Sequence, residues 1–92
     1  KTIAPNNYQV QFQQAIFLLN YALQKKEVKY LLLAQKHIQY AIEIKNDYFD
    51  GWYLWGDILV QLGLAYKEIQ YFQDSDKSYQ KAFSFSFASI CT

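Results

Sequence analysis

The sequence predicts an all-α protein built from antiparallel helical hairpins. Its 92 residues include three glycines and one proline, and residues that favour helices fill the middle of the chain. Apolar residues recur at spacings of three and four, the period of an α-helix that buries one face. Short polar segments separate four such stretches, so neighbouring helices should run antiparallel. With 52% hydrophobic residues the chain can form a core, and its length allows one domain or a piece of a larger protein.

The first two helices are predicted from apolar stripes on either side of the polar segment KKE at 25–27. Asn6 or Asn7 can cap the first helix, because its side-chain oxygen can accept from the free N–H groups of the first turn. The apolar face of this helix contains Phe12, Ile16, Leu19 and Leu23. The second helix should run from about Val28 to Lys45, with the stripe Leu31, Ala34, Ile38, Ala41 and Ile42. Its alanines allow a neighbouring helix to approach closely.

The last two helices follow the polar segment KND at 45–47. Asp47 can cap the third helix, and Asp50 favours the positive end of its dipole. This helix should run from about Tyr48 to Tyr66, with Trp52, Trp55, Gly56, Leu59 and Leu62 in line. The fourth helix should begin at Ile69 or Tyr71 and end at Phe87. Its stripe continues through the sequence QDSD as Phe72, Ser75, Tyr79, Ala82 and Phe83.

Two pairs of segments resemble each other at fixed spacings. Residues 17–27 align with 51–61 at an offset of 34, which matches Leu18, Tyr21 and Ala22 with Trp52, Trp55 and Gly56. Residues 34–44 align with 75–85 at an offset of 41, which matches Ala34, Ile38 and Ala41 with Ser75, Tyr79 and Ala82. The two offsets differ by seven residues, and we assign the difference to an insertion at about 64–70 in the second hairpin.

The 34-residue spacing and the residues Trp52, Gly56, Tyr79 and Ala82 resemble the tetratricopeptide repeat, whose motif is W-x2-L-G-x2-Y followed by A-x3-F. Trp55 and Leu59 stand where that family usually has leucine and tyrosine, and the frequent proline after the second helix is replaced by Asn46. The resemblance implies a short α-solenoid of stacked hairpins. Its first repeat would span 15–48 and its second 49–89, with residues 1–14 as an N-terminal helical extension.

Two sets of residues are candidates for contacts. The structural seam between helices is predicted to contain Trp52, Trp55, Gly56, Ala34, Ala41 and Ala82. An aromatic stripe at helical spacing is more often core than a ligand-stacking site, and we interpret Trp52, Trp55, Tyr79 and Phe83 in this way. The resemblance implies that the first helix of each hairpin lines a concave groove. Its candidate residues are Leu19, Asn20, Leu23 and Glu27 in the first repeat and Asp50, Tyr53, Asp57 and Gln61 in the second.

The sequence argues against several classes of function. His37 is the only histidine and Cys91 the only cysteine, so neither a catalytic nor a metal site is expected, and no cofactor is expected. The chain has no arginine and a net charge of +1, which disfavours nucleic acid as a partner. It also disfavours the clamp of Lys, Asn and Arg by which some tetratricopeptide domains hold a chaperone carboxylate. The longest apolar run, Ala15–Leu19, is too short to cross a membrane.

The resemblance therefore implies a non-catalytic protein–protein interaction module, an adaptor, scaffold or assembly factor that binds a peptide or helix of another protein. The Asp50 and Asp57 carboxylates beside Tyr53 favour a partly basic partner with an apolar surface. Because two repeats leave an unfinished end, the C-terminal aromatic helix should pack on another repeat, a second copy or a larger complex. Two alternatives stay open: a regulatory or scaffolding segment of a larger enzyme, and a small structural subunit of a large assembly. The single cysteine fits a reducing compartment such as the cytoplasm or an organelle interior.

Overall fold

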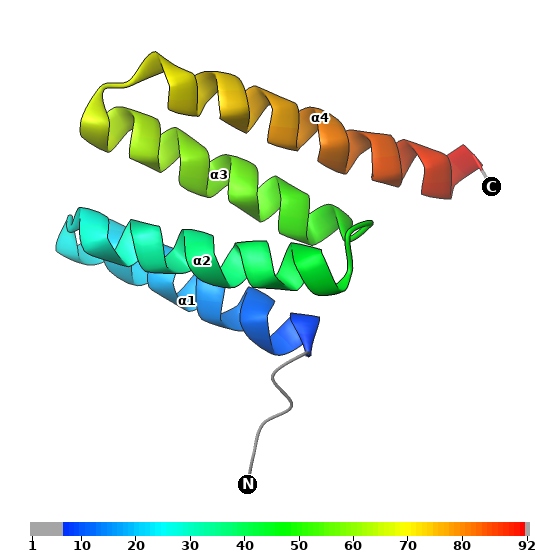
Figure 1. The fold of residues 1–92 in the computed structure, drawn as a ribbon, viewed down its shortest axis with the longest axis horizontal. Helices are drawn as coiled ribbons and strands as arrows, with labels where there is room; N and C mark the ends of the chain where they lie inside the picture. Colours follow the sequence, from blue (N-terminus) through cyan, green and yellow to red (C-terminus); the bar gives the residue numbers. More distant parts are fainter. Residues whose placement is uncertain (1–6, 92) are drawn as a thin grey trace, which may run out of the picture.

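The computed structural model describes residues 7–91 as four α-helices in two antiparallel hairpins (Figure 1). The helices are α1 (Tyr8–Lys25), α2 (Val28–Ile44), α3 (Phe49–Tyr66) and α4 (Ile69–Cys91). Side chains are described through Phe85, and within this part of the chain there is no β-strand. The predicted all-α class is confirmed. Residues 1–6 of the predicted extension and the side chains of Phe87 and Cys91 lie outside the described residues.

The predicted helix ends at Val28, Tyr66 and Ile69 agree with the structure, and those at Lys45 and Tyr48 differ by one residue. Asn7 caps α1, because its Oδ1 accepts from the N–H groups of Gln9 at 2.9 Å and Val10 at 3.3 Å. Asp47 does not cap α3, and Tyr48 stands at that position without a side-chain hydrogen bond. The Asp47 carboxylate is instead paired with Lys45 at 3.0 Å, which removes it from the helix end. The helix α4 continues past Phe87 to Cys91.

The four helices lie side by side in the order of the chain (Figure 1). The most extensive contacts join α1 to α2 and α3 to α4, while α2 also packs on α3 and α1 touches α3 only at its edge. The molecule is a slab with extents of 40 × 39 × 18 Å. The contact between the two hairpins is therefore made mainly by α2 and α3.

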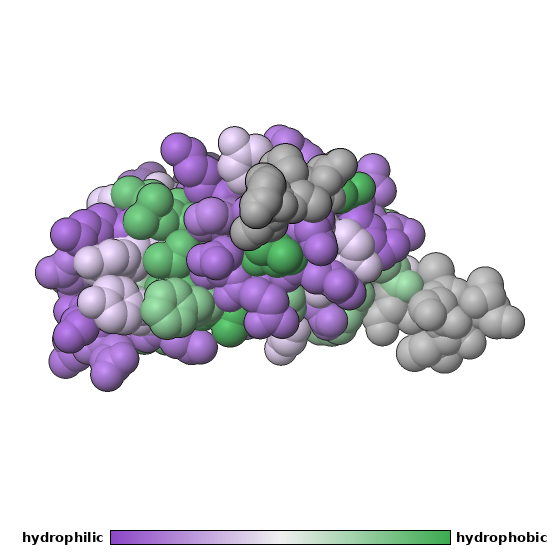
Figure 2. Space-filling model, turned by 90° about the horizontal axis from the view of Figure 1, so that it is seen from below, coloured by the Kyte–Doolittle hydropathy of each residue, from purple (hydrophilic) through white to green (hydrophobic). Residues whose placement is uncertain are grey.

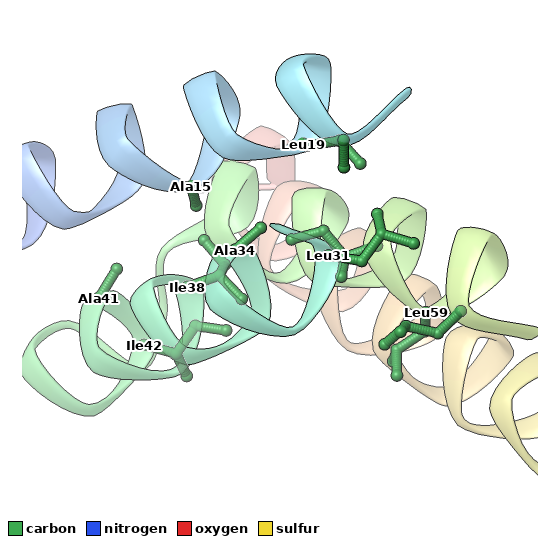
Figure 3. Packing of buried hydrophobic residues seen from close by; sticks show 11 residues of the cluster. Ala15, Leu19, Leu31, Ala34, Ile38, Ala41, Ile42 and Leu59 are labelled. Carbon is green, nitrogen blue, oxygen red and sulfur yellow. The ribbon is translucent and has the colours of Figure 1, made fainter. Parts of the chain in front are cut away.

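The hydrophobic core consists of buried aliphatic residues from α1, α2 and α3. Ile38, Ile58 and Leu62 are the largest side chains that are fully buried. In Figure 3, Ala15 of α1 points toward Ala34 of α2, where the small side chains let the two helices approach. The predicted contact alanines Ala34, Ala41 and Ala82 are all fully buried.

Both hairpins have the same dimensions up to the second helix. Phe49 at the start of α3 follows Tyr8 at the start of α1 by 41 residues, and Ile69 follows Val28 by the same number. Each first helix contains 18 residues. Each ends at a lysine in the left-handed conformation, Lys26 with φ 58° and Lys67 with φ 55°. The chain is therefore a repeat with a single period of 41 residues.

The predicted seven-residue insertion at 64–70 is wrong, because both hairpins, and not the second alone, are seven residues longer than a 34-residue unit. The pairing of Leu18, Tyr21 and Ala22 with Trp52, Trp55 and Gly56 is shifted by one heptad. Seven residues make almost two helical turns, so a helix aligned seven positions out of register still presents the same face. The true counterparts of Trp52, Trp55 and Gly56 are Gln11, Gln14 and Ala15, and residues 8–14 form the first two turns of α1.

Candidate functional site

The contact between α3 and α4 depends on glycine. A β-carbon on Gly56 would lie 2.5 Å from Cε1 of Tyr79, and one on Gly63 would lie 2.9 Å from Cζ of Phe72. No side chain fits at such a distance without movement of the ring, so the aromatic rings of α4 rest on the backbone of α3. At Gly56, which the sequence predicts as a close-contact position, the neighbour is Tyr79.

Hydroxyl groups of α4 complete this contact. Ser75 Oγ donates to the Gly56 carbonyl at 2.9 Å, and Ser78 Oγ donates to the Trp52 carbonyl at 2.7 Å. Both serines are buried, so these hydrogen bonds satisfy hydroxyl groups that would otherwise be unpaired. The Tyr79 hydroxyl donates to the Asp57 carboxylate. Burial, and then this hydrogen bond, raise the pKa of Tyr79 above its ordinary value.

Two tryptophans occupy the adjacent side of α3. The rings of Trp52 and Trp55 are stacked with their centroids 5.5 Å apart, and both pack against the core while remaining half-buried. Trp52 Nε1 donates to the Asn46 carbonyl at 2.7 Å, and Trp55 Nε1 donates to Gln35 Oε1 at 3.4 Å. Both indole N–H groups therefore have a hydrogen-bond partner, which orients the rings.

The tryptophans form the floor of a groove of about 490 Å³ between α2 and α4. Leu59 extends the floor along α3. The wall on α2 presents the amide side chains of Gln35 and Gln39. The wall on α4 consists of Tyr71, Asp74, Lys77, Ser78 and Lys81. An aromatic floor with polar groups on both rims is typical of a binding site for a ligand with an apolar part and a polar part.

The rim of this groove on α4 has uncommitted positive charge. Lys81 Nζ lies 5.7 Å from the centroid of the Trp52 ring, a cation–π distance. The carboxylate of Asp74 accepts a hydrogen bond from Gln70 at 3.0 Å. Within the described residues, the ion pairs join only Lys29 to Glu27 and Lys45 to Asp47. Lys77 and Lys81 therefore have no carboxylate partner in this part of the chain, and they can receive one from a ligand.

The structure brings together three of the predicted groove residues. Leu23 near the end of α1, Glu27 just before α2, and Gln61 of α3 line another cavity, of about 270 Å³. Asn20 is exposed on α1 but does not line this cavity. Leu19 is buried in the core, so it is not available to a partner. The first-repeat candidates thus divide between the core, the surface and one small cavity.

The predicted residues at the start of α3 have different surroundings. Asp50 is exposed in the first turn of the helix. Asp57 is half-buried and accepts the hydrogen bond from Tyr79, so part of its capacity is used inside the hairpin. The Tyr53 ring lies 5.3 Å from that of Tyr79 and 6.1 Å from that of Phe83, measured between centroids. The predicted face therefore consists of an aromatic cluster, and its Asp57 carboxylate is hydrogen-bonded to Tyr79.

Sequence reasoning missed the groove over the tryptophans. It assigned Trp52 and Trp55 to a seam, whereas they both pack on the core and line the groove. Lys77 and Lys81 were not singled out, although they are four residues apart on the same helix as Ser78. The signal in the sequence was this spacing, because residues at i and i+4 share a helix face.

The single histidine is tied to a neighbouring helix. His37 Nδ1 and Gln11 Oε1 are 2.8 Å apart, which links α2 to α1. Among the described residues, no three His, Cys, Asp or Glu side chains come together as a metal site would require. In the same part of the chain, none of the helices combines the length and the apolar character that crossing a membrane demands.

Comparison with known proteins gives no relative. The sequence matches no protein-family model, no curated protein and no solved structure.

Proposed function

We propose that this chain is a non-catalytic protein–protein interaction module, and that it binds an acidic segment of a partner protein in the groove over Trp52 and Trp55. The observation that carries the proposal is the groove itself: two fixed, half-buried indoles lie between an amide rim and a lysine rim. An apolar or aromatic side chain of the partner would rest on the indoles. A carboxylate beside it would pair with Lys77 or Lys81.

A polypeptide fits this groove for two reasons. Gln35 and Gln39 are one helical turn apart, and each amide offers both donors and acceptors, as a peptide backbone requires. The groove crosses three helices, so a segment lying in it would contact both hairpins at once. The α4 rim favours acidic over basic segments because its two lysines, Lys77 and Lys81, outnumber its single carboxylate, Asp74.

The small residues at repeated positions support a tetratricopeptide-like solenoid, although the period of 41 residues differs from that of the family. Small residues recur in both first helices at Ala15 and Gly56, and in both second helices at Ala34 and Ser75. Ala15 with Ala34, and Gly56 with Ser75, mark the contact between the two helices of each hairpin. The tetratricopeptide family uses small residues in the same way. Both hairpins would then be longer than the 34-residue family unit by seven residues, or about two helical turns.

The test is selection of binders from a displayed library of random peptides, with the intact chain as bait. Enriched peptides should combine an aromatic or large aliphatic residue with neighbouring Asp or Glu. The double variant Lys77→Glu, Lys81→Glu should weaken their binding at least tenfold, or about 1.4 kcal/mol. Lys36→Glu is the matched control, because Lys36 is exposed on α2 away from this groove and should leave binding unchanged.

Two results would overturn the assignment. Enriched peptides that bind the doubly reversed variant as well as the original chain would remove the groove from consideration. Basic peptides whose binding is lost on Asp50→Lys would transfer the site to the face around Tyr53 that the sequence predicted.

A further inference from the structure

The second hairpin leaves uncovered a face whose counterpart in the first hairpin is buried. Leu31 and Ile42 of α2 are 5% and 6% exposed. At the same positions of the 41-residue repeat, Phe72 and Phe83 of α4 are 37% and 55% exposed. The residues at this position are apolar in both hairpins, so the difference in exposure comes from the presence or absence of a neighbour.

The neighbour that covers the first hairpin is the start of α3. A β-carbon on Gly51 would lie 3.4 Å from Ile42, which shows how closely α3 approaches α2. The ring of Tyr48, just before α3, meets Tyr8 and Phe12 edge to face, with centroids 4.9 Å and 5.2 Å apart. The face of the first hairpin thus receives a helix and the aromatic residue ahead of it.

The second hairpin repeats this receiving face. The counterparts of Tyr8 and Phe12 are Phe49 and Tyr53, whose rings are stacked with centroids 5.8 Å apart. Phe83 joins them from α4, with its centroid 6.1 Å from each ring. Tyr53 is 44% exposed, and no other element of the described chain covers the cluster. We call this surface, formed by Phe49, Tyr53, Phe72 and Phe83, the receiving face.

The first helix carries the other half of the same contact. On α3, Ile58 and Leu62 belong to the core shared with α1 and α2 and are fully buried. Their counterparts on α1 are Phe17, which is 63% exposed, and Tyr21. These two rings are stacked with centroids 6.0 Å apart. Figure 2 views the molecule from the α1 side, where hydrophobic side chains interrupt the polar surface. We call the pair Phe17 and Tyr21 the inserting face.

We infer that copies of this chain associate head to tail, with the inserting face of one copy seated on the receiving face of the next. The chain repeats the apolar positions of a contact that it already makes once between its own hairpins, with Asn7 and Val10 in place of Tyr48 and Gly51, so a second copy supplies an apolar neighbour to each end. Such a contact joins different surfaces of the two copies, and it propagates into an open array unless its rotation closes a ring. It uses neither Lys77 nor Lys81, and it is independent of the groove.

The test is sedimentation velocity of the intact chain over a range of concentrations. The original chain should form species larger than a monomer as its concentration rises. Phe17→Glu should remove the inserting face and Phe83→Glu the receiving face, and each variant alone should stay monomeric. An equimolar mixture of the two variants should form a dimer and nothing larger, because only one intact pair of faces remains.

Three controls keep this result specific. Tyr40→Glu changes an aromatic residue that is equally exposed but lies on neither face, and it should associate like the original chain. Circular dichroism should show unchanged helix content for every variant. Tyr53→Glu, at a position of the receiving face that is 44% exposed, replaces Phe83→Glu if the latter loses helicity.

The inference is overturned if the chain stays monomeric at all concentrations. It is also overturned if the chain associates only when it is part of a longer protein. Association that Phe17→Glu leaves intact and Phe83→Glu removes would also overturn it, since that pattern indicates a symmetric contact through α4 alone.

Discussion

The ring of Tyr79 lies against the backbone of Gly56, at a distance that leaves no room for a β-carbon. At the corresponding positions of the first hairpin, an alanine and an isoleucine, Ala15 and Ile38, are both fully buried. The two hairpins thus fill the space between their helices in different ways. The first packs a small residue against a medium-sized one, and the second packs a glycine, which has no side chain, against a large ring. The same exchange recurs one heptad on, where Ala22 and Leu31 are replaced by Gly63 and Phe72.

Gly56→Ala should destabilise the protein. In an unconstrained helix this change would stabilise by about 1 kcal/mol, because alanine is the better helix former. Here the new methyl group meets the Tyr79 ring, and overpacking of this kind costs about 1–3 kcal/mol. The free energy of unfolding from urea titration checks the sign, and an increase in stability would show that the ring moves away freely.

Tyr79→Ile should reverse much of that loss when combined with Gly56→Ala, since the pair then matches Ala15 and Ile38. We expect a coupling free energy of about 1–3 kcal/mol in the double-mutant cycle. Gly51→Ala with Tyr79→Ile is the matched control, because a β-carbon on Gly51 meets Tyr48 and not Tyr79, and these two changes should be additive.

Tyr79→Phe should reduce stability by about 1.5 kcal/mol at neutral pH, the low end for a hydrogen bond to a charged group, because the pair is only partly buried. The raised pKa of Tyr79 means that its neutral form is favoured in the folded state. Its stabilisation should therefore be fully present below the ordinary tyrosine pKa of about 10 and should decline as the pH rises above it. Urea titrations of both proteins at neutral and alkaline pH give the difference. A stability gap that widens with pH would contradict the assignment.

Lys67→Gly should stabilise the protein by about 0.5–1 kcal/mol. Lys67 has a left-handed backbone at the end of α3, a conformation that costs a residue with a β-carbon about 1–2 kcal/mol. Glycine removes this cost and loses part of the gain through its greater freedom in the unfolded chain. Lys36→Gly, inside α2, is the control and should destabilise by about 1 kcal/mol. Thermal unfolding distinguishes the two directions.

Fluorescence quenching should report the charge of the groove, because the only two tryptophans of the chain both line it. The ratio of iodide quenching to caesium quenching should be higher in the folded protein than in denaturant, since the nearby Lys77 and Lys81 attract anions. The double variant Lys77→Glu, Lys81→Glu should lower this ratio below its value in denaturant. A ratio that is the same in the folded and unfolded protein would indicate that the Asp74 carboxylate cancels the lysines. In denaturant the two proteins should give the same ratio.

The sequence was sufficient for the helices because each has a continuous apolar stripe and a polar break at its ends. The stripe through Ser75 and Tyr79 correctly predicted that α4 continues across the polar QDSD sequence. Asp47 does not cap α3, because Lys45, two residues before it, pairs with its carboxylate. Local geometry decides whether this carboxylate binds Lys45 or the backbone N–H groups of the helix.

The groove could not be found from the sequence for a related reason. Trp52 and Trp55 have the spacing of a buried stripe, and periodicity cannot say that one side of a stripe faces an opening between α2 and α4. The heptad error in the repeat had a similar origin, since a shift of two turns leaves the helix face unchanged. Tyr53 and Asp57 were placed correctly on one face of α3, but their contacts with Tyr79 depend on the register of α4, which spacing within α3 does not contain.

The aliphatic cluster that holds α1, α2 and α3 together contains no residue of α4. The last helix is attached to α3 through ring contacts on glycine and through the hydroxyl groups of Ser75, Ser78 and Tyr79. Release of α4 therefore breaks its ring contacts with α3 and its hydroxyl hydrogen bonds while the aliphatic cluster remains intact, so amide protons in α4 should exchange with solvent sooner than those of the other three helices. The helix α4, which completes both the groove and the receiving face, is then also the helix that detaches first from the rest of the molecule.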